Sequence, residues 1–315
     1  MRIPLGDIIG ILGGSQISNK AWQDIVIALR LPRAVTACLG GAALAVSGLF
    51  MQTLFQNPLA GPFVLGINSG ASLGVALVMM AAGTTGASFL VAGGITGDIG
   101  VVLAASTGSA LVMAMVLVAA RRISSNTVLL VMGIMFGYAV NALVSVLIHF
   151  SFAERVQAYL AWSFGSFSTS SAGDLTVMAP VILTGLVFSF PMAKQLNALV
   201  LGESYAATMG VEIKVLRSVA IVIAAVLAGT VTAFCGPVAF LGIAVPHLAR
   251  NVIRTGDHRL LIPGCILTGA IMALAADIAV NLPGSGTALP LNAVTSLIGA
   301  PVVIWIIARY QHVSG

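Results

Sequence analysis

The sequence predicts an all-α protein, a polytopic bundle of about nine transmembrane helices, from three observations. Hydrophobic residues make up 59% of the 315-residue chain and charged residues only 7%, against roughly 45–50% and 25% in soluble domains. Apolar runs that could cross a bilayer recur along the whole chain. The 35 glycines are typical of helices that pack closely in membranes. This composition excludes a soluble enzyme, a nucleic-acid-binding domain and a disordered chain.

Nine segments are candidates for crossing the membrane, which takes about 20 mostly apolar residues per helix. They are 34–55, 67–83, 99–120, 127–150, 175–192, 218–235, 236–249, 260–282 and 293–310. The seventh, 236–249, is too short to cross alone, so its neighbours must shield it. Pro58 and Pro62 interrupt the chain after the first helix. We expect one transmembrane domain, 34–315, after an external amphipathic segment, 1–33.

Lysine and arginine predict the orientation, because cytoplasmic loops carry an excess of them. With a cytoplasmic C-terminus, nine of the 14 basic residues lie inside, namely 121, 122, 194, 214, 217, 250, 254, 259 and 309. The four basic residues of 1–33 are then outside, although cations before a first span favour a cytoplasmic N-terminus. We therefore expect one further helix upstream, in a multi-pass protein of the inner (plasma) membrane.

Recognisable catalytic and metal-binding groups are missing from the sequence. It has no GxxxxGK[ST] phosphate loop and no HExxH motif, so ATP would have to be hydrolysed by a partner. Cys38, Cys235 and Cys265 lie singly in apolar runs, which argues against a metal site. Asp277 is the one acid deep in a predicted span, and it is either a proton site or a structural acid bonded to a neighbouring helix.

Several ordered motifs indicate a family. They are RLPR at 30–33, QNPLA at 56–60, LGE at 201–203, FLGIAVPHLAR at 240–250 and GDHR at 256–259. Over nearly its whole length the chain resembles the FecCD-type permease family, the membrane subunits of type II ABC importers for iron–siderophore, haem or cobalamin. The family pattern has ten helices, so the resemblance implies that the first of them is missing here.

The resemblance implies a transport subunit and not an enzyme. The expected partners are a second permease in a homodimer, two cytoplasmic ATPases that bind ATP and Mg²⁺, and an extracytoplasmic substrate-binding protein; no cofactor is expected in this chain. The expected cargo is an iron–siderophore or haem complex, carried by alternating access. A cobalamin permease is the alternative within the family. From another class, the alternative is a proton-coupled secondary transporter that uses Asp277.

Two groups of site residues follow from the resemblance. Arg30 and Arg33 are expected to dock the binding protein through its acids, with Asn281 where the family often has a third arginine. The alternative is a pair of arginines that only reach the membrane interface. The segment Asn57-Pro58-Leu59 is expected to be a cytoplasmic gate that closes the translocation path. The alternative is a plain helix break.

Two further groups are expected on the cytoplasmic side. Glu203, Ala206, Ala207 and Gly210 resemble the E-x-x-A-A-x-x-G pattern of coupling loops, whose small residues fit a groove on an ATPase. The alternative is a generic charged loop. The second group either braces that loop or anchors a helix end, and it comprises His247, Arg250, Asp257, His258 and Arg259.

Overall fold

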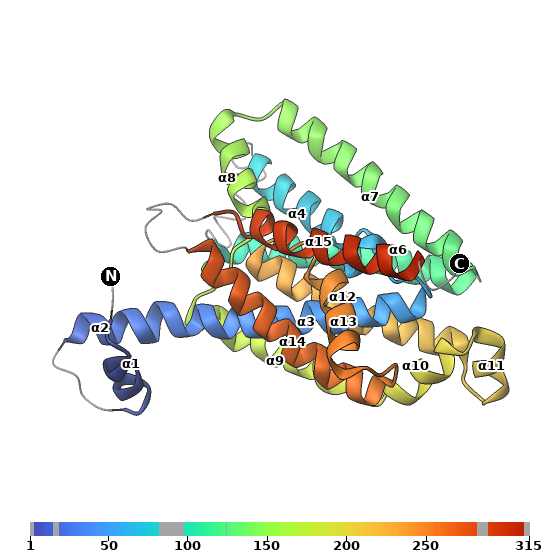
Figure 1. The fold of residues 1–315 in the computed structure, drawn as a ribbon. Helices are drawn as coiled ribbons and strands as arrows, with labels where there is room; N and C mark the ends of the chain where they lie inside the picture. The colour runs from blue at the N-terminus through green and yellow to red at the C-terminus, as the bar shows by residue number, and fades with distance from the viewer. Residues whose placement is uncertain (1–2, 15–18, 82–97, 124, 282–288, 312–315) are drawn as a thin grey trace.

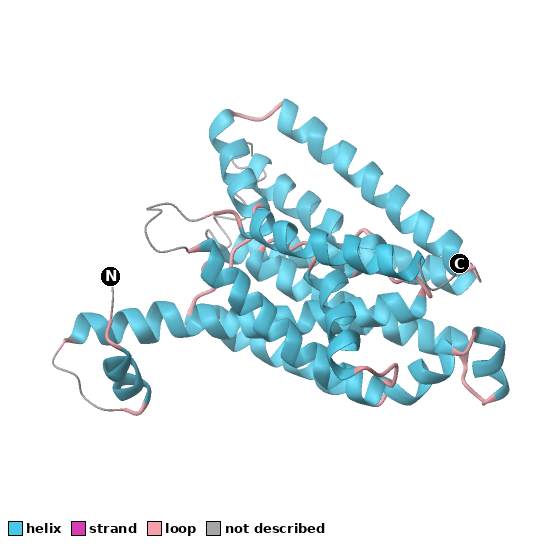
Figure 2. Ribbon diagram, in the orientation of Figure 1, coloured by secondary structure: helices cyan, strands magenta, loops and turns pink. Residues whose placement is uncertain are grey.

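The computed structural model describes residues 3–14, 19–81, 98–123, 125–281 and 289–311, and these residues contain helices without strands (Figures 1 and 2). Nine helices match the nine predicted segments. They are α3 (Leu31–Leu54), α4 (Ile67–Ala81), α6 (Asp98–Arg122), α7 (Asn126–His149), α9 (Ala172–Ser189), α12 (Ile213–Cys235), α13 (Leu241–Ile253), α14 (His258–Val280) and α15 (Leu291–Gln311). The predicted all-α bundle is therefore confirmed.

Not all nine are long enough to cross a membrane alone. Among the described residues, six helical stretches are sufficiently long and apolar, and α4 and α15 contain shorter apolar stretches. The seventh predicted span is the short one: α13 has 13 residues. It packs against α3, α14 and α15. Because protein covers α13 in this way, a short helix is tolerated at membrane depth.

The first long helix begins earlier than the predicted 34. The chain runs without interruption from α2 (Lys20–Asp24) through the π-helical η1 (Ile25–Arg30) into α3. Pro32 stands in the first turn of α3, where a proline without an N–H group is tolerated and the wider π turn before it leaves room for the ring. Part of the predicted external segment is thus helix, and α1 (Leu5–Leu12) packs against it through Ile11 and Val26.

Glycines set the distances between the central helices. A Cβ on Gly41 of α3 would lie 2.1 Å from the carbonyl oxygen of Gly269 in α14, and one on Gly70 of α4 would lie 2.5 Å from that of Gly108 in α6. Only helices without side chains at these points can approach so closely. The bundle therefore contains two tight helix pairs, α3 with α14 and α4 with α6.

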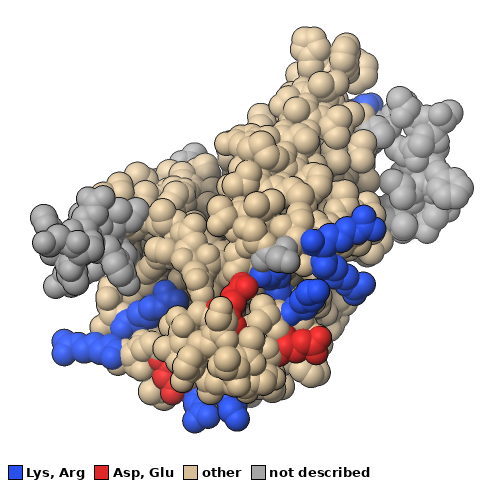
Figure 3. All heavy atoms as spheres, turned by 90° about the vertical axis from the view of Figure 1, so that its right-hand side faces the viewer, with Lys and Arg blue, Asp and Glu red and all other residues tan. Residues whose placement is uncertain are grey.

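Shorter helices connect the long ones. These are η2 (Pro62–Leu65), α8 (Ala153–Ser163), α10 (Ala193–Val200) and α11 (Glu203–Thr208). The last two lie at the right-hand end of the bundle in Figure 1. Figure 3 looks onto that end and shows lysine and arginine side chains gathered around it. Since basic residues mark the cytoplasmic side, this end has the charge expected of a cytoplasmic face.

Candidate functional site

Three of the four predicted groups of site residues meet at the basic end of the bundle. The predicted gate follows α3, the predicted coupling residues form α11 and the turn after it, and the predicted brace comes from α13 and α14. Buried polar side chains join the predicted gate and the predicted brace around the end of α3. Helix α11 is attached to the bundle separately, through Glu203.

The end of α3 is shaped by its sequence. After Leu54 the backbone of Gln56 takes a positive φ of 46°, and Pro58 cannot continue the helix. The Asn57 backbone N–H donates to the Gln52 carbonyl (3.1 Å), and its side-chain Oδ1 accepts from the Leu59 N–H (2.9 Å). The asparagine thereby folds the predicted gate back onto α3, leaving Leu59 exposed at its tip.

Helix α13 holds the predicted gate from one side. The His247 Nε2 lies 2.7 Å from the Pro58 carbonyl oxygen, which can only accept, so the histidine donates. Arg250 donates to the side-chain oxygen of Gln52 (2.7 Å), and the Gln52 amide nitrogen donates to the Ile243 carbonyl (3.1 Å). Two residues of the predicted brace therefore bind the gate and the end of α3 directly.

Helix α14 and helix α10 hold the end of α3 from the other side. The Thr53 Oγ1 lies 2.8 Å from His258 Nε2, and His258 Nδ1 lies 2.8 Å from the Asn197 Oδ1 of α10. A second link joins the Gln56 amide nitrogen to the Leu199 carbonyl (3.2 Å). Thr53 and His258 are 5% and 1% exposed, so water cannot replace these bonds without opening the structure.

Asp257 caps α14 at the surface of this network. Its Oδ1 accepts from the backbone N–H of Arg259 (2.9 Å) and from the Asn197 amide nitrogen (2.5 Å). The Arg259 N–H, followed by the Asn197 amide, lowers the pKa of the Asp257 carboxyl, because both donors favour its charged form. Asp257 is therefore a charged N-cap, whereas the Arg259 side chain is exposed.

The predicted coupling helix α11 is held by its first residue. Glu203 Oε1 accepts from the Asn126 amide nitrogen of α7 (2.6 Å) and from Arg217 Nη2 of α12 (3.0 Å). Arg217 is 3% exposed and also donates to the Ile123 carbonyl. Glu203 therefore ties α11 to the bundle with its side chain, which is a structural role beyond the predicted contact with a partner.

The other predicted coupling residues differ in how far their side chains are exposed. Ala206 is buried, whereas neighbouring side chains form an exposed and largely apolar tip: Leu201, Tyr205, Ala207 and Met209. Gly210 has φ +82°, and a Cβ added to it would meet nothing within 4 Å; it makes the predicted turn after α11. The tip is small, convex and open to a partner.

The fourth predicted group lies away from the basic end. Arg33 does not point outward alone, because its Nε and Nη2 donate to both carboxylate oxygens of Asp277 at 2.7–3.0 Å. The Asn281 amide donates to the Asp277 carbonyl (2.7 Å), while Arg30 is exposed. The structure thus brings Arg33 and Asn281 together around Asp277, in the structural-acid arrangement that was one of the two alternatives for this residue.

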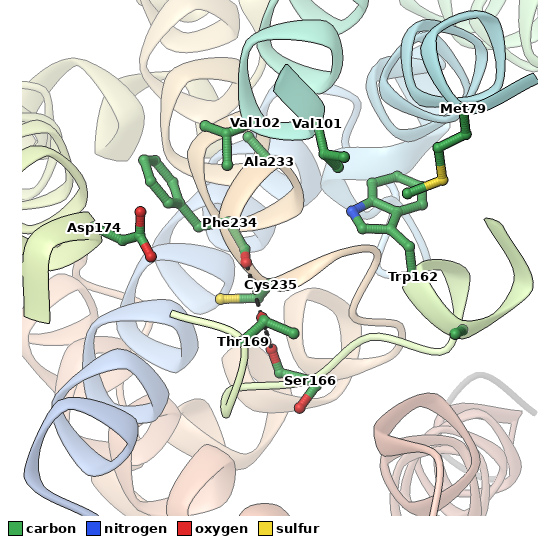
Figure 4. A pocket seen from close by; sticks show the side chains of 11 residues that line it. Met79, Val101, Val102, Trp162, Ser166, Thr169, Asp174, Ala233, Phe234 and Cys235 are labelled. Carbon is green, nitrogen blue, oxygen red and sulfur yellow. Dashed lines mark hydrogen bonds between the residues drawn. The ribbon is translucent and has the colours of Figure 1, made fainter. Parts of the chain in front are cut away.

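A pocket of about 250 Å³ lies at the opposite end of α12 (Figure 4). It is lined mainly by apolar side chains, among them Val102 and Phe234, with Trp162 at one side. Its polar groups mostly have partners within the chain: Thr169 donates to the Phe234 carbonyl (3.0 Å), and Asp174 binds Ser171. None of the predicted site residues lines it.

The described residues offer no candidate metal site. No group of three or more His, Cys, Asp or Glu there could hold a metal ion. The three cysteines are free thiols, and Cys235 and Cys265 are buried.

The sequence did not predict the polar partners in α3 and α10. Gln52, Thr53, Gln56 and Asn197 were not singled out, yet the structure joins three of them to the predicted brace and Gln56 to Leu199 of α10. A signal was present, because two adjacent polar residues, Gln52 and Thr53, end an otherwise apolar helix. The partners of the four residues are about 60 to 205 positions away in the chain, and spacing arguments do not reach that far.

Comparison with known proteins gives consistent similarities. Residues 1–309 match the FecCD transport family. The chain is 35% identical over 316 residues to the vitamin B12 import system permease protein BtuC of Salmonella paratyphi A, covering 98% of this chain and 93% of that one. It is 34% identical over 296 residues to BtuC of Klebsiella pneumoniae, with 94% and 86% covered. A solved structure described as an inward-facing metal-chelate type ABC transporter superposes with a TM-score of 0.83 at 27% identity, covering 93% and 90%.

Proposed function

Because the chain belongs to the FecCD transport family as the permease subunit of an ABC importer, we propose that it carries a cobalamin-class metal chelate across the inner membrane. The observation that supports this cargo is the identity of 34–35% with vitamin B12 permeases over nearly the whole chain. The iron–siderophore or haem cargo expected from the motifs is the competing possibility. The likeness to a metal-chelate type transporter is compatible with either.

The permease is not an enzyme, and ATP hydrolysis takes place in partner ATPases. We place the contact with those ATPases at α11 and the turn at Gly210. In support, this tip is exposed, largely apolar and convex, and it lies at the basic end of the bundle (Figure 3). Glu203 holds the tip against α7 and α12, so a push on α11 reaches the membrane helices instead of only bending a loop.

Transport would follow an alternating-access cycle. ATP binding on the partners displaces α11, and the segment at Asn57-Pro58-Leu59 opens or closes the cytoplasmic side of the path. A nucleotide can shift this equilibrium only if the complex binds it differently in the two states. A second permease, in a homodimer, completes the path, and a binding protein delivers the chelate at the opposite end, near Arg30 and Arg33.

Uptake into proteoliposomes tests the proposed cargo. The permease is reconstituted with its two ATPases and its binding protein, and uptake of cyanocobalamin, a ferric siderophore and haem is compared with and without ATP. We expect ATP-dependent uptake of cyanocobalamin. ATP-dependent uptake of the ferric siderophore or haem alone would overturn the cobalamin assignment but keep the importer. Uptake driven by a proton gradient without ATP would instead favour the secondary transporter.

A further inference from the structure

Three side chains connect α10, the helix that precedes the predicted coupling residues, with the end of α3 that carries the predicted gate. Of the three, only His258 belongs to a motif or group singled out in the sequence. We infer that Asn197, His258 and Thr53 form a rigid joint, which makes α10 and the end of α3 move together and transmits displacement of α11 to the gate. The inference rests on the proposed function, since it concerns how ATP-driven movement reaches the path. These are positioning residues, which act through the segments that they hold.

The first link is between α11 and α10. Only Leu201 and Gly202 separate the two helices, so a displacement of α11 reaches α10 directly along the chain, in addition to reaching α7 and α12 through Glu203. Helix α10 in turn buries Leu196 and Leu199 against the bundle and packs on both α3 and α14. It is therefore placed as a lever between the coupling tip and those two helices.

The second link is the side-chain amide of Asn197. The groups around this amide determine which way it is oriented. Asn197 Nδ2 faces the carboxylate of Asp257, which can only accept, so the amide oxygen must face His258. That oxygen accepts from the His258 backbone N–H (2.8 Å) and lies 2.8 Å from Nδ1. Nδ1 must then carry the proton, so in the neutral ring Nε2 accepts from the Thr53 hydroxyl (2.8 Å). The same hydroxyl lies 3.0 Å from the Leu49 carbonyl oxygen in its own helix, so its one proton is shared between the two acceptors.

The third link is between Thr53 and the gate. Thr53 lies one helical turn before Asn57, whose N–H donates to the Gln52 carbonyl. The bond from Gln56 to Leu199 runs parallel to the Asn197–His258–Thr53 path and ties the same two elements. Because Thr53 and His258 are buried, their hydrogen bonds are costly to leave unmade, and the elements stay joined during movement.

Helix α11 has a separate attachment, which makes the joint testable. Glu203 binds Asn126 and Arg217 without passing through α10. Loss of the joint should therefore leave α11 in place and the ATPases bound, while the gate no longer follows their movement. The expected defect is uncoupling and not failure to assemble.

The test compares Thr53→Val, which keeps the side-chain shape but removes the hydroxyl, with Thr53→Ser, which keeps the hydroxyl. Thr232→Val is the matched control, because Thr232 is also buried and donates to the carbonyl four residues before it, as Thr53 does to Leu49. Among the described residues, Thr232 makes no hydrogen bond to another helix. Each variant is assembled with the ATPases and the binding protein. Cyanocobalamin uptake and ATP hydrolysis are measured on the same proteoliposomes.

We expect Thr53→Val to lower uptake per ATP hydrolysed about tenfold, the equivalent of about 1.4 kcal/mol, with basal hydrolysis unchanged. Thr53→Ser and Thr232→Val should match the wild type. An equal ratio of uptake to ATP hydrolysis in Thr53→Val and Thr232→Val would overturn the proposed joint. An equal defect in Thr53→Ser, or loss of assembly in Thr53→Val alone, would assign the contact to packing or folding and would also overturn it.

A second readout does not depend on the cargo. Leu59→Cys is labelled with a maleimide in a chain whose three native cysteines are replaced by alanine. We expect ATP binding to change the labelling rate with Thr53 present, and no change with Thr53→Val. A change of equal size in both would overturn the joint. Absence of ATP-dependent uptake in the wild type would instead count against the proposed function.

Discussion

At the scale of single residues, the partly buried charged side chains of Arg33 and Asp277 bind each other between two helices. Arg33 and Asp277 form a two-oxygen ion pair whose side chains are 24% and 15% exposed. Such a pair holds α3 to α14 and also places the arginine at the molecular end where a binding protein would dock. A carboxylate held in this way is poorly suited to carry protons, because the guanidinium occupies the oxygens that a proton would bind.

Asp277→Asn tests which role this acid has. The change leaves Arg33 partly buried without its counter-ion, and we expect a loss of about 1–3 kcal/mol of stability, as for hydrogen bonds to charged groups. Thermal unfolding in detergent measures it. The exchange Arg33→Asp with Asp277→Arg should recover much of that loss. ATP-driven uptake should persist in Asp277→Asn; its complete loss at unchanged stability would favour the proton site.

A substitution at Gly210 can act in two ways, through strain in the backbone of the turn or through a clash with the bound ATPase. Its φ of +82° is unfavourable for any residue with a Cβ, whatever the free space around it. We expect Gly210→Val to uncouple hydrolysis from uptake, through strain in the turn or through a clash with the ATPase. Asparagine tolerates this φ better than valine does. Normal coupling in Gly210→Asn would therefore assign the effect to the backbone, and a defect as large as in Gly210→Val would assign it to bulk at the interface.

At the scale of elements, glycine contacts decide which helices move as one body. Helices α3 and α14 touch backbone to backbone at Gly41 and Gly269, and the buried polar network joins the same two helices at the basic end. Helices α4 and α6 touch in the same way at Gly70 and Gly108. The short η2 and the turn before it connect these pairs along the chain, so bending is expected there before either pair separates.

Gly41→Ala tests the α3–α14 contact. The new methyl group would lie 2.1 Å from the Gly269 carbonyl oxygen, so the helices must separate. We expect destabilisation of about 1–3 kcal/mol, as in other overpacked cores, measured by thermal unfolding in detergent. Gly229→Ala in α12 is the control, because its nearest neighbour would be 3.6 Å away. Equal stability of the two variants would show that α3 and α14 can adjust.

At the scale of the whole molecule, the position of the basic residues indicates which end of the bundle faces the cytoplasm. Helices α10 and α11 lie at that end, and α8 lies toward the opposite, left-hand end of the bundle in Figure 1. If cytoplasmic loops carry the excess of lysine and arginine, then α11 faces the cytoplasm and α8 the outside. Side chains on these two short helices can therefore report the orientation.

Cysteine labelling in intact cells tests this topology. We expect a membrane-impermeant maleimide to reach Ala153→Cys at the start of α8 from outside, and Thr208→Cys in α11 only after the membrane is opened. Both residues are exposed, so accessibility reports the side of the membrane and not burial. The reverse result would invert the orientation, and with it the placement of the ATPase contact.

Several features of this protein could be predicted from the sequence because they depend on composition and local pattern. The nine helices follow from apolar runs separated by proline and charge. The short seventh span was predicted at 236–249, and α13 (Leu241–Ile253) begins five residues later and ends four residues later. The family follows from motifs that are continuous in the chain. The turn at Gly210 follows from glycine itself, which accepts a positive φ.

Only the tertiary structure determined which residues far apart in the chain bind each other. Arg33 and Asp277 are 244 positions apart, and Thr53 and His258 are 205 apart. Hydropathy and spacing describe neighbours on one helix, whereas these pairs depend on how the glycine contacts set α3 against α14. A buried polar group needs a partner, and the sequence can indicate that need. Which group supplies the partner depends on helix packing, so the ion pair and the proposed joint became visible only in the folded chain.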